Sequence, residues 1–326
     1  MSDNVNEIVT EETQATPETS ATPEINQAQD SALIAGVMHE RDMQKVSSKQ
    51  AAMKIVSQVG VYTFLGIMAL VVLFPFYWML ISSVKPLEEY NRQIPTLFPE
   101  TFVWYNYVDA FDTANLGTLF GNTLYVGLVS TVLSLIITVL SAFAFARLEF
   151  KGKDAFFGVL LATMMIPGEL FTITNYPTVS IFGWLNTFTV LIVPFLVSVF
   201  YIYLLKQNFM QIPNELYLAA KIDGTSDLKY LWKVMIPLAL PTLISITILK
   251  MMGAWNSYAW PNLVVDDAHS LITNGLRSFF SDDKLETYGV PMQMASVTLV
   301  SIPLFLVFVF LRKYIMKGVS RSGIKG

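Results

Sequence analysis

Six runs of apolar residues, each long enough to cross a lipid bilayer, dominate this sequence of 326 residues. About 20 helical residues, rising 1.5 Å each, span the roughly 30 Å hydrocarbon core of a membrane. Each run therefore predicts a transmembrane helix, and the fold class is predicted to be an all-α membrane protein with six transmembrane helices. The predicted spans are 60–82, 119–146, 155–173, 188–205, 241–260 and 294–311.

The composition excludes several kinds of chemistry. Apolar residues make up 53% of the chain and charged residues only 14%, against about 25% charged in soluble domains. There is no cysteine, which excludes disulfides, thiolate metal sites and cysteine nucleophiles. His39 and His269 lie far apart, and neither a P-loop nor a G-x-G-x-x-G motif is present. We expect no cofactor, no metal site and no catalytic residues.

Residues 1–40 differ from the rest of the chain because they hold eight acidic residues and no basic one. Such a polar segment cannot bury enough apolar surface to offset the entropy lost on ordering. We therefore expect a disordered acidic tail at 1–40, retained on the mature protein because the pattern of a secretory signal is missing. Residues 41–58 mix basic and apolar residues, which predicts a membrane-surface helix, and 59–326 form the predicted transmembrane domain.

The basic residues are distributed unevenly between the segments that join the spans. Sixteen of the 21 Lys and Arg residues fall on one side, four fall on the other, and Lys250 lies inside a span. Cytoplasmic segments carry the excess of Lys and Arg, so the richer side is predicted to be the cytoplasm. Both termini and the segment 212–237 are then cytoplasmic, and the chain is a multi-pass protein of the cell membrane.

The polar segment 212–237 has the pattern of two short helices. Pro213 suits the first position of a helix, and Glu215 favours the positive end of its dipole. The chain is predicted to turn at Asp223 and Gly224, because glycine readily adopts the left-handed backbone that ends a helix. The second helix is predicted to carry one apolar face, formed by Leu228, Leu231, Trp232 and Met235. We interpret this segment as a hairpin that fills a groove on another protein.

The hairpin contains the string Ala-Ala-Lys-Ile-Asp-Gly at 219–224, followed by an apolar helix and Ile-Pro-Leu at 236–238. This pattern resembles the cytoplasmic loop signature of the membrane permeases of binding-protein-dependent ABC importers, notably the carbohydrate group that includes the maltose permease. Further matches in the right order extend the resemblance over roughly residues 60–326. They lie at 144–147, 255–256, 260–261 and 313–326.

The resemblance implies that 212–237 is a coupling hairpin that docks in a cleft of an ATPase subunit. The residues predicted to couple to the ATPase are Glu215, Ala219, Ala220, Asp223, Gly224, Leu228 and Trp232. Leu218 stands where the family usually has Glu. The expected apolar contact with the ATPase subunit is therefore retained, but the carboxylate contact of the family is missing. The implied partners are a sister permease, two cytoplasmic ABC ATPase subunits, an extracytoplasmic solute-binding protein and the lipid of a prokaryotic plasma membrane, with no nucleic acid.

The leading functional hypothesis is a permease subunit of an ATP-driven importer for a sugar or oligosaccharide, with ATP hydrolysis on a partner. The alternatives are a secondary transporter or an ABC permease for a non-sugar solute. A secondary transporter needs a coupling-ion site, for which Glu169 is the main candidate carboxylate. A membrane-embedded enzyme is a third hypothesis, which the lack of clustered carboxylates, histidines and cysteines disfavours.

The fifth predicted span and the residues next to it hold four candidates for the substrate pathway, namely Lys250, Trp255, Asn256 and Tyr258. Counted from Pro241, Lys250 lies roughly 13–14 Å into the core. A lysine there costs on the order of 2.5–3.5 kcal/mol, so it should face a partner or a wet cavity. The sequence leaves open whether Lys250 fixes packing against a neighbouring subunit or lines the translocation cavity.

Two segments are predicted on the outer side of the membrane. Residues 83–118 contain prolines and aromatic residues typical of an interfacial anchor. Residues 261–293 are polar and acidic, and they form the long outer loop that is predicted to follow the fifth span. In the resembling family this loop approaches the solute-binding protein.

Overall fold

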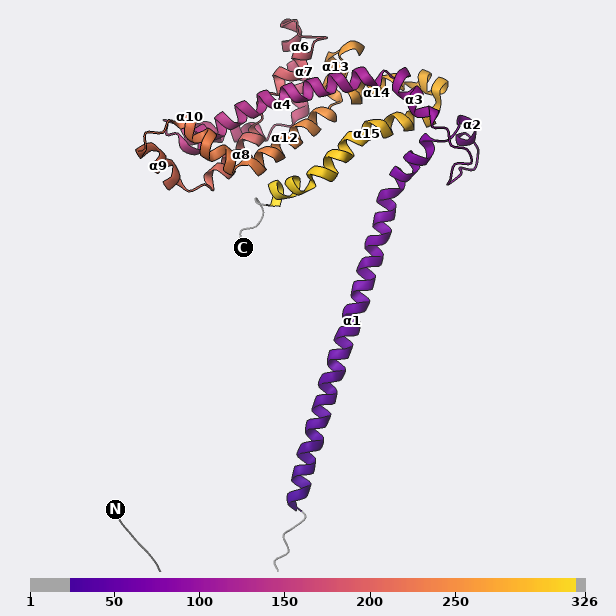
Figure 1. Ribbon diagram of the computed structural model, residues 1–326, viewed down its shortest axis with the longest axis vertical. Coiled ribbons are helices and arrows are strands. Elements are labelled where there is room, and N and C mark those ends of the chain that lie inside the picture. The colour runs from indigo at the N-terminus through magenta and orange to yellow at the C-terminus, as the bar shows by residue number, and fades with distance from the viewer. Residues whose placement is uncertain (1–23, 321–326) are drawn as a thin grey trace, which may run out of the picture. The chain divides into compact units, whose positions relative to one another are not determined.

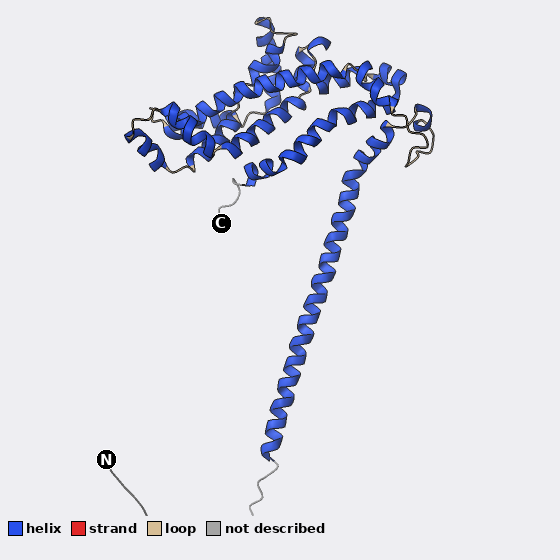
Figure 2. Cartoon of the chain, viewed as in Figure 1, coloured by secondary structure: helices blue, strands red, loops and turns tan. Residues whose placement is uncertain are grey.

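The computed structural model describes residues 24–320, with the side chains left out at 24–32, 34, 37, 39–52, 169, 282–288 and 313–320. Every regular element within this range is a helix, and no strand occurs among the described residues (Figure 2). The prediction of an all-α protein is therefore confirmed. The first part of the predicted acidic tail, 1–23, and the last residues of the chain, 321–326, lie outside the described range, as does the side chain of Glu169.

The chain divides into two units, 1–73 and 74–326. The elements, labelled in Figure 1, are α1 (Glu24–Ser83), α2 (Leu87–Tyr90), α3 (Tyr105–Thr113), α4 (Leu116–Arg147), α5 (Lys153–Thr163), α6 (Gly168–Ile181), α7 (Phe188–Ile192), η1 (Val193–Phe195), α8 (Val199–Met210), α9 (Asn214–Ile222), α10 (Asp227–Tyr230), η2 (Leu231–Met235), α11 (Ile236–Leu238), α12 (Leu240–Trp255), α13 (Ala259–Val264), η3 (Asp267–His269), α14 (Ile272–Phe279) and α15 (Asp282–Ser320).

Helix α1 is continuous from Glu24 to Ser83. The sequence analysis places boundaries at 40 and 58, yet the helix crosses both, because residues 24–58 contain many strong helix formers and no proline. From Met53 onward the helix is long and apolar enough to cross a membrane.

The described helices give fewer clear spans than the six predicted from the sequence. Three are long and apolar enough by themselves, at Met53–Ser83, Leu116–Arg147 and Gly289–Arg312, and two bent pairs raise the number to five. The predicted span 155–173 is divided between α5 and α6, since Pro167 is extended (φ −55°, ψ 131°) and begins a new helix. The count of six is thus not established by helix length.

Helix α4 is the centre of the second unit. It packs against α3, α8, α12 and α14 (Figure 1). Small residues let membrane helices approach closely, and the buried hydroxyl side chains along α4 are Thr123, Ser130, Thr131, Ser134 and Thr138. At Gly127 an added Cβ would lie only 3.2 Å from Met251 Cε. Helix α12 therefore packs directly onto the bare backbone of α4.

The two ends of this unit carry different elements. Helices α9 and α10 lie at one end, and α3 and α14 lie near the other (Figure 1). Near α14, Asn122 donates to the carbonyls of Ala268 and Ser270, both at 3.0 Å, and the N–H of Ile272 donates to Thr123 Oγ1 at 2.8 Å. The segment 261–293, predicted as a loop, thus consists largely of helices, of which α14 packs on α4.

Candidate functional site

The segment 212–237 forms a hairpin whose turn has the geometry of a Schellman motif. Helix α9 ends at Ile222, and Gly224 has a positive φ of 69°. The N–H of Thr225 donates to the carbonyl of Ala220 at 2.9 Å, and the N–H of Gly224 donates to that of Lys221 at 3.0 Å. This pattern satisfies the last carbonyls of α9 and fixes the direction in which the chain leaves it.

The second half of the hairpin presents two faces rather than the single apolar face predicted for it. Leu231 and Met235 are fully buried, whereas Leu228 and Trp232 are 58% and 65% exposed. Residues 231–235 form a π-helical turn, η2, in which side chains do not follow the spacing of 3.6 residues per turn. The four residues predicted to share one face therefore divide into a buried pair, Leu231 and Met235, and an exposed pair, Leu228 and Trp232.

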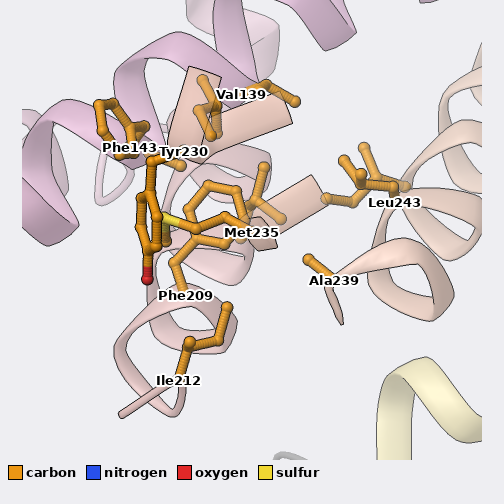
Figure 3. Packing of buried hydrophobic residues seen from close by; sticks show 12 residues of the cluster. Val139, Phe143, Phe209, Ile212, Tyr230, Met235, Ala239 and Leu243 are labelled. Carbon is orange, nitrogen blue, oxygen red and sulfur yellow. The ribbon is translucent and has the colours of Figure 1, made fainter. Parts of the chain in front are cut away.

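The anchored face is buried among side chains that come from distant parts of the sequence. Tyr230 and Met235 lie against Phe143 of α4 and Phe209 of α8 (Figure 3). The ring centroids of Tyr217 and Tyr230 are 5.2 Å apart, which ties α9 to α10. The hairpin is therefore fixed to the helices behind it by a well-packed apolar cluster.

Arg147, at the end of α4, supports the base of the hairpin. Its Nη2 donates to the carbonyl of Phe209 at 2.9 Å and to that of Ile212 at 2.5 Å, and its side chain is buried. These carbonyls lie where α8 ends and the chain enters the hairpin, and that of Phe209 also accepts from the N–H of Ile212 at 3.2 Å. The sequence analysis noted residues 144–147 as a family match but gave Arg147 no role.

A polar cluster joins the two arms of the hairpin at its surface. Asp227 accepts a hydrogen bond from Tyr217 Oη at 2.8 Å and pairs with Lys221 Nζ at 2.7 Å. The hydrogen bond with Asp227 raises the pKa of Lys221, which therefore remains protonated at neutral pH. The angle between α9 and α10 is held by this cluster together with the turn at Gly224.

The residues predicted to couple to an ATPase all lie on this hairpin. Glu215, Ala219, Asp223, Gly224, Leu228 and Trp232 are exposed, and Ala220 is half-buried against the apolar cluster. Three further apolar side chains are exposed beside them, namely Leu216, Leu218 and Ile222, the last at 87%. The hairpin therefore combines a rigid base with an uncovered apolar surface.

The four residues predicted for the substrate pathway do not form one site. Trp255 is buried against Phe120, and Asn256 ends α12 by donating to the carbonyl of Met252 at 2.9 Å. Tyr258 is half-buried under the guanidinium of Arg277, 5.3 Å from its ring centre. Lys250 alone among the four lines a pocket of about 370 Å³ between α4, α8, α12 and α13.

Lys250 has a partner within its own chain. Its Nζ donates to the carbonyl of Phe195 at 2.6 Å, at the break between η1 and α8. Trp260 lines the same pocket and donates from Nε1 to the carbonyl of Val190 at 3.0 Å. In the described part of the chain no three metal-ligating side chains come together.

The segment after α1 contains a buried ionic cluster. Glu89 is 2% exposed and accepts hydrogen bonds from Thr96 Oγ1 at 2.5 Å and from the N–H of Glu100. Lys85 is 1% exposed and donates to the carbonyl of Thr96 at 2.5 Å. The hydrogen bond from Thr96 is the largest of the effects that lower the pKa of Glu89.

The lowered pKa of Glu89 predicts that acid destabilises this segment. A carboxylate whose pKa is lower in the folded state stabilises it above the unfolded value of about 4.3 and loses that contribution as pH falls through the folded value. Glu89→Gln should lower the unfolding temperature at pH 7 and flatten its dependence on pH below about 4.3. Thermal unfolding of the reconstituted protein measures this, with the exposed neighbour Glu88→Gln as the matched control. An unchanged acid dependence in Glu89→Gln would contradict the assignment.

Apolar helices of spanning length, a pocket at a broken helix and a hairpin with an exposed apolar surface together indicate a membrane-embedded transport protein. The chain belongs to the family of binding-protein-dependent transport system inner membrane components, whose model matches residues 116–321. The family resemblance seen in the sequence is thereby confirmed. Members of this family are transport permeases and not enzymes, so the chain is a multi-pass permease of a cell membrane.

Relatives agree with this assignment along most of the chain. The arabinooligosaccharides transport system permease protein AraQ of Halalkalibacterium halodurans is 31% identical over 265 residues, which cover 79% of this chain and 93% of the relative. The inner membrane ABC transporter permease protein YcjP of Escherichia coli is 28% identical over 278 residues, covering 84% and 98%. The sn-glycerol-3-phosphate transport system permease protein UgpE of Pectobacterium atrosepticum is 28% identical over 267 residues, covering 79% and 93%.

The fold has a counterpart among solved structures. A chain in the crystal structure of a bacterial ABC transporter involved in the import of the acidic polysaccharide alginate superposes with a TM-score of 0.73. It is 25% identical in sequence, and the match covers 79% of this chain and 96% of that one.

Proposed function

We propose that this permease forms half of the solute pathway of an ATP-driven importer for a sugar or oligosaccharide. Two relatives are named or described for carbohydrates, arabinooligosaccharides in one case and alginate in the other. ATP hydrolysis takes place on separate subunits, since the sequence has no phosphate-binding loop. The complex contains a sister permease, two ATPase subunits and an external solute-binding protein.

The exposed apolar surface of the hairpin carries this proposal. Ile222, Leu228 and Trp232 are more than half exposed on a segment whose opposite face is tightly packed. Apolar side chains held rigidly at a surface mark a protein interaction site, and the ATPase subunit is the partner that this family supplies. Leu218, 54% exposed, widens the apolar contact at the position where related sequences usually carry Glu.

Purification of the tagged full-length chain from its native membrane tests the proposal. We expect two ATPase subunits and a second permease to be recovered in fixed proportion, and the reconstituted complex to import an oligosaccharide only with ATP and the binding protein. A secondary transporter would instead move solute through this chain alone along an ion gradient. Transport without ATPase subunits would therefore overturn the proposal.

The proposed topology has six spans and both termini in the cytoplasm, and it predicts which positions a reagent can reach. The chain has no cysteine, so single cysteines can be placed at positions 229 and 284 without background. A membrane-impermeant maleimide should label Lys284→Cys in intact cells and Lys229→Cys only after permeabilisation. Mass spectrometry of the purified chain measures the labelling. The reverse pattern would contradict the proposed orientation.

A further inference from the structure

The pocket that contains Lys250 lies at a break in a membrane helix. The segments Phe188–Phe195 and Val199–Met210 together have the length and apolarity of a span but are bent by 44°. Phe195, Val197 and Ser198 at the break line the pocket, as does Tyr201 on the first turn of α8. Non-helical backbone at membrane depth is tolerated where it lines a protein cavity.

Two sources of positive charge meet in this pocket. Lys250 donates to the carbonyl of Phe195 at 2.6 Å, and an ammonium group has three donors, so two remain for a ligand. Ser198 caps α8 with its side chain accepting from the N–H of Tyr201, which places the positive end of a 12-residue helix at the same wall. The residues that line the pocket include no carboxylate.

The remaining lining suits a sugar ring. Ser257 adds a hydroxyl group, and Phe195 and Tyr201 add aromatic surface, whereas Trp260 and Ser130 are buried in the pocket wall. Trp260 is held in place by its hydrogen bond to the carbonyl of Val190 and by an edge contact with Phe195 at 5.8 Å. A volume of about 370 Å³ lies within the range of roughly 300–1,000 Å³ of small-molecule sites.

We propose that this pocket binds the carboxylate of an acidic sugar, so that the solute of this permease carries negative charge. The carboxylate lies between Lys250 Nζ and the N-terminus of α8, and the ring packs against Phe195, which is 41% exposed. The inference rests on the proposed function, and it extends that function from sugars in general to acidic ones. It also adds an opposite charge to the backbone carbonyl that already pairs with this lysine inside the membrane.

This inference is tested by measuring how tightly digalacturonate binds the purified full-length chain in phosphatidylcholine nanodiscs. The matched neutral ligand is the same disaccharide with both carboxylates reduced to primary alcohols. We expect the acidic disaccharide to bind at least tenfold more tightly than the neutral one, and added NaCl to weaken only the acidic ligand. Equal affinity for the two ligands, or no binding of the acidic one, overturns the inference.

Three variants assign the effect to the pocket. Lys250→Met should weaken digalacturonate binding at least tenfold, Lys250→Arg should retain most of it, and Lys54→Met, which removes an exposed lysine outside the pocket, should leave it unchanged. Binding of the neutral disaccharide serves as a check that Lys250→Met is folded. Digalacturonate binding that survives in a folded Lys250→Met overturns the assignment.

Two further experiments distinguish a bound lipid from a bound solute, and a failure of this inference from a failure of the proposed function. An anionic lipid headgroup could offer the same chemistry, and in that case phosphatidylglycerol in the nanodiscs would compete with digalacturonate and overturn the solute assignment. If the assembled complex imports a neutral oligosaccharide at equal rates with wild-type chain and Lys250→Met, the permease function stands and the inference about acidic sugars fails. A complex that binds the acidic disaccharide but never imports with ATP contradicts the proposed function instead.

Discussion

Gly224→Val is expected to abolish import while the protein still inserts into the membrane. Gly224 has φ of 69° with no atom within 4 Å of an added Cβ, so the change acts through backbone strain and not through a clash. A left-handed conformation costs a non-glycine residue roughly 1–2 kcal/mol, and more for a β-branched side chain. That energy lowers the equilibrium constant for forming the native turn by about 5- to 30-fold.

Loss of the turn redirects the exposed face of the hairpin. The hydrogen bonds from the N–H groups of Gly224 and Thr225 define where α10 begins, and Leu228 and Trp232 are carried by the residues that follow. ATP-dependent uptake by the reconstituted complex and recovery of ATPase subunits with the tagged chain both measure the effect. We expect both to fall at least fivefold, in proportion to the lost native population.

Two glycine substitutions serve as controls for this experiment. Gly224→Asn should retain most of the activity, because asparagine tolerates the left-handed region. Gly158→Val adds the same side chain on α5, where no positive φ is required and no atom lies within 4 Å of the new Cβ, so ATPase recovery should be unaffected. Normal uptake by Gly224→Val would mean that the turn does not couple the permease to its partner.

Arg147→Met is expected to loosen the base of the hairpin and release the ATPase subunits. The substitution keeps an apolar chain of similar length but removes the donors to the carbonyls of Phe209 and Ile212. The carbonyl of Phe209 keeps its bond from the N–H of Ile212, so the main loss is at the carbonyl of Ile212. A buried acceptor left unsatisfied costs about 1–3 kcal/mol, a substantial fraction of the stability of a whole domain, about 5–15 kcal/mol.

Hydrogen exchange locates the effect within the chain. The amides of α8 and α9 should exchange at least tenfold faster in Arg147→Met, while those of α14 at the other end of the unit should keep their protection. In Arg147→Lys these amides should exchange at rates between those of the wild type and Arg147→Met, because an ammonium lacks the planar fork of a guanidinium. Arg92→Met is the matched control, since Arg92 makes only an exposed pair with Glu100. If the amides of α8 and α9 exchange at the same rate in Arg147→Met, Arg147→Lys and Arg92→Met, Arg147 does not support the hairpin.

Local chemistry determined much of what could be read from the sequence. The apolar runs identified an all-helical membrane protein, because bilayer thickness imposes a length that any spanning helix must meet. The turn at Asp223 and Gly224 was equally predictable, since few residues other than glycine adopt positive φ. The string at 219–224 named the family because it combines this turn with a fixed sequence around it.

Tertiary structure decided which side chains are available for function. Leu228, Leu231, Trp232 and Met235 share one face only if the helix keeps 3.6 residues per turn, and the π-turn at Leu231–Met235 divides them. Trp255 is buried because Phe120 lies against it, although the two are far apart in sequence.

The partners of the two notable cations were likewise invisible in the sequence. Arg147 contacts carbonyls more than 60 residues away, and Lys250 contacts one 55 residues away. Both partners are backbone carbonyls, which every residue carries and which therefore leave no mark in a sequence pattern. Only the packing of α8 and α12 against α4 brings these carbonyls to the two cations, and that packing fixes the base of the hairpin and the wall of the pocket.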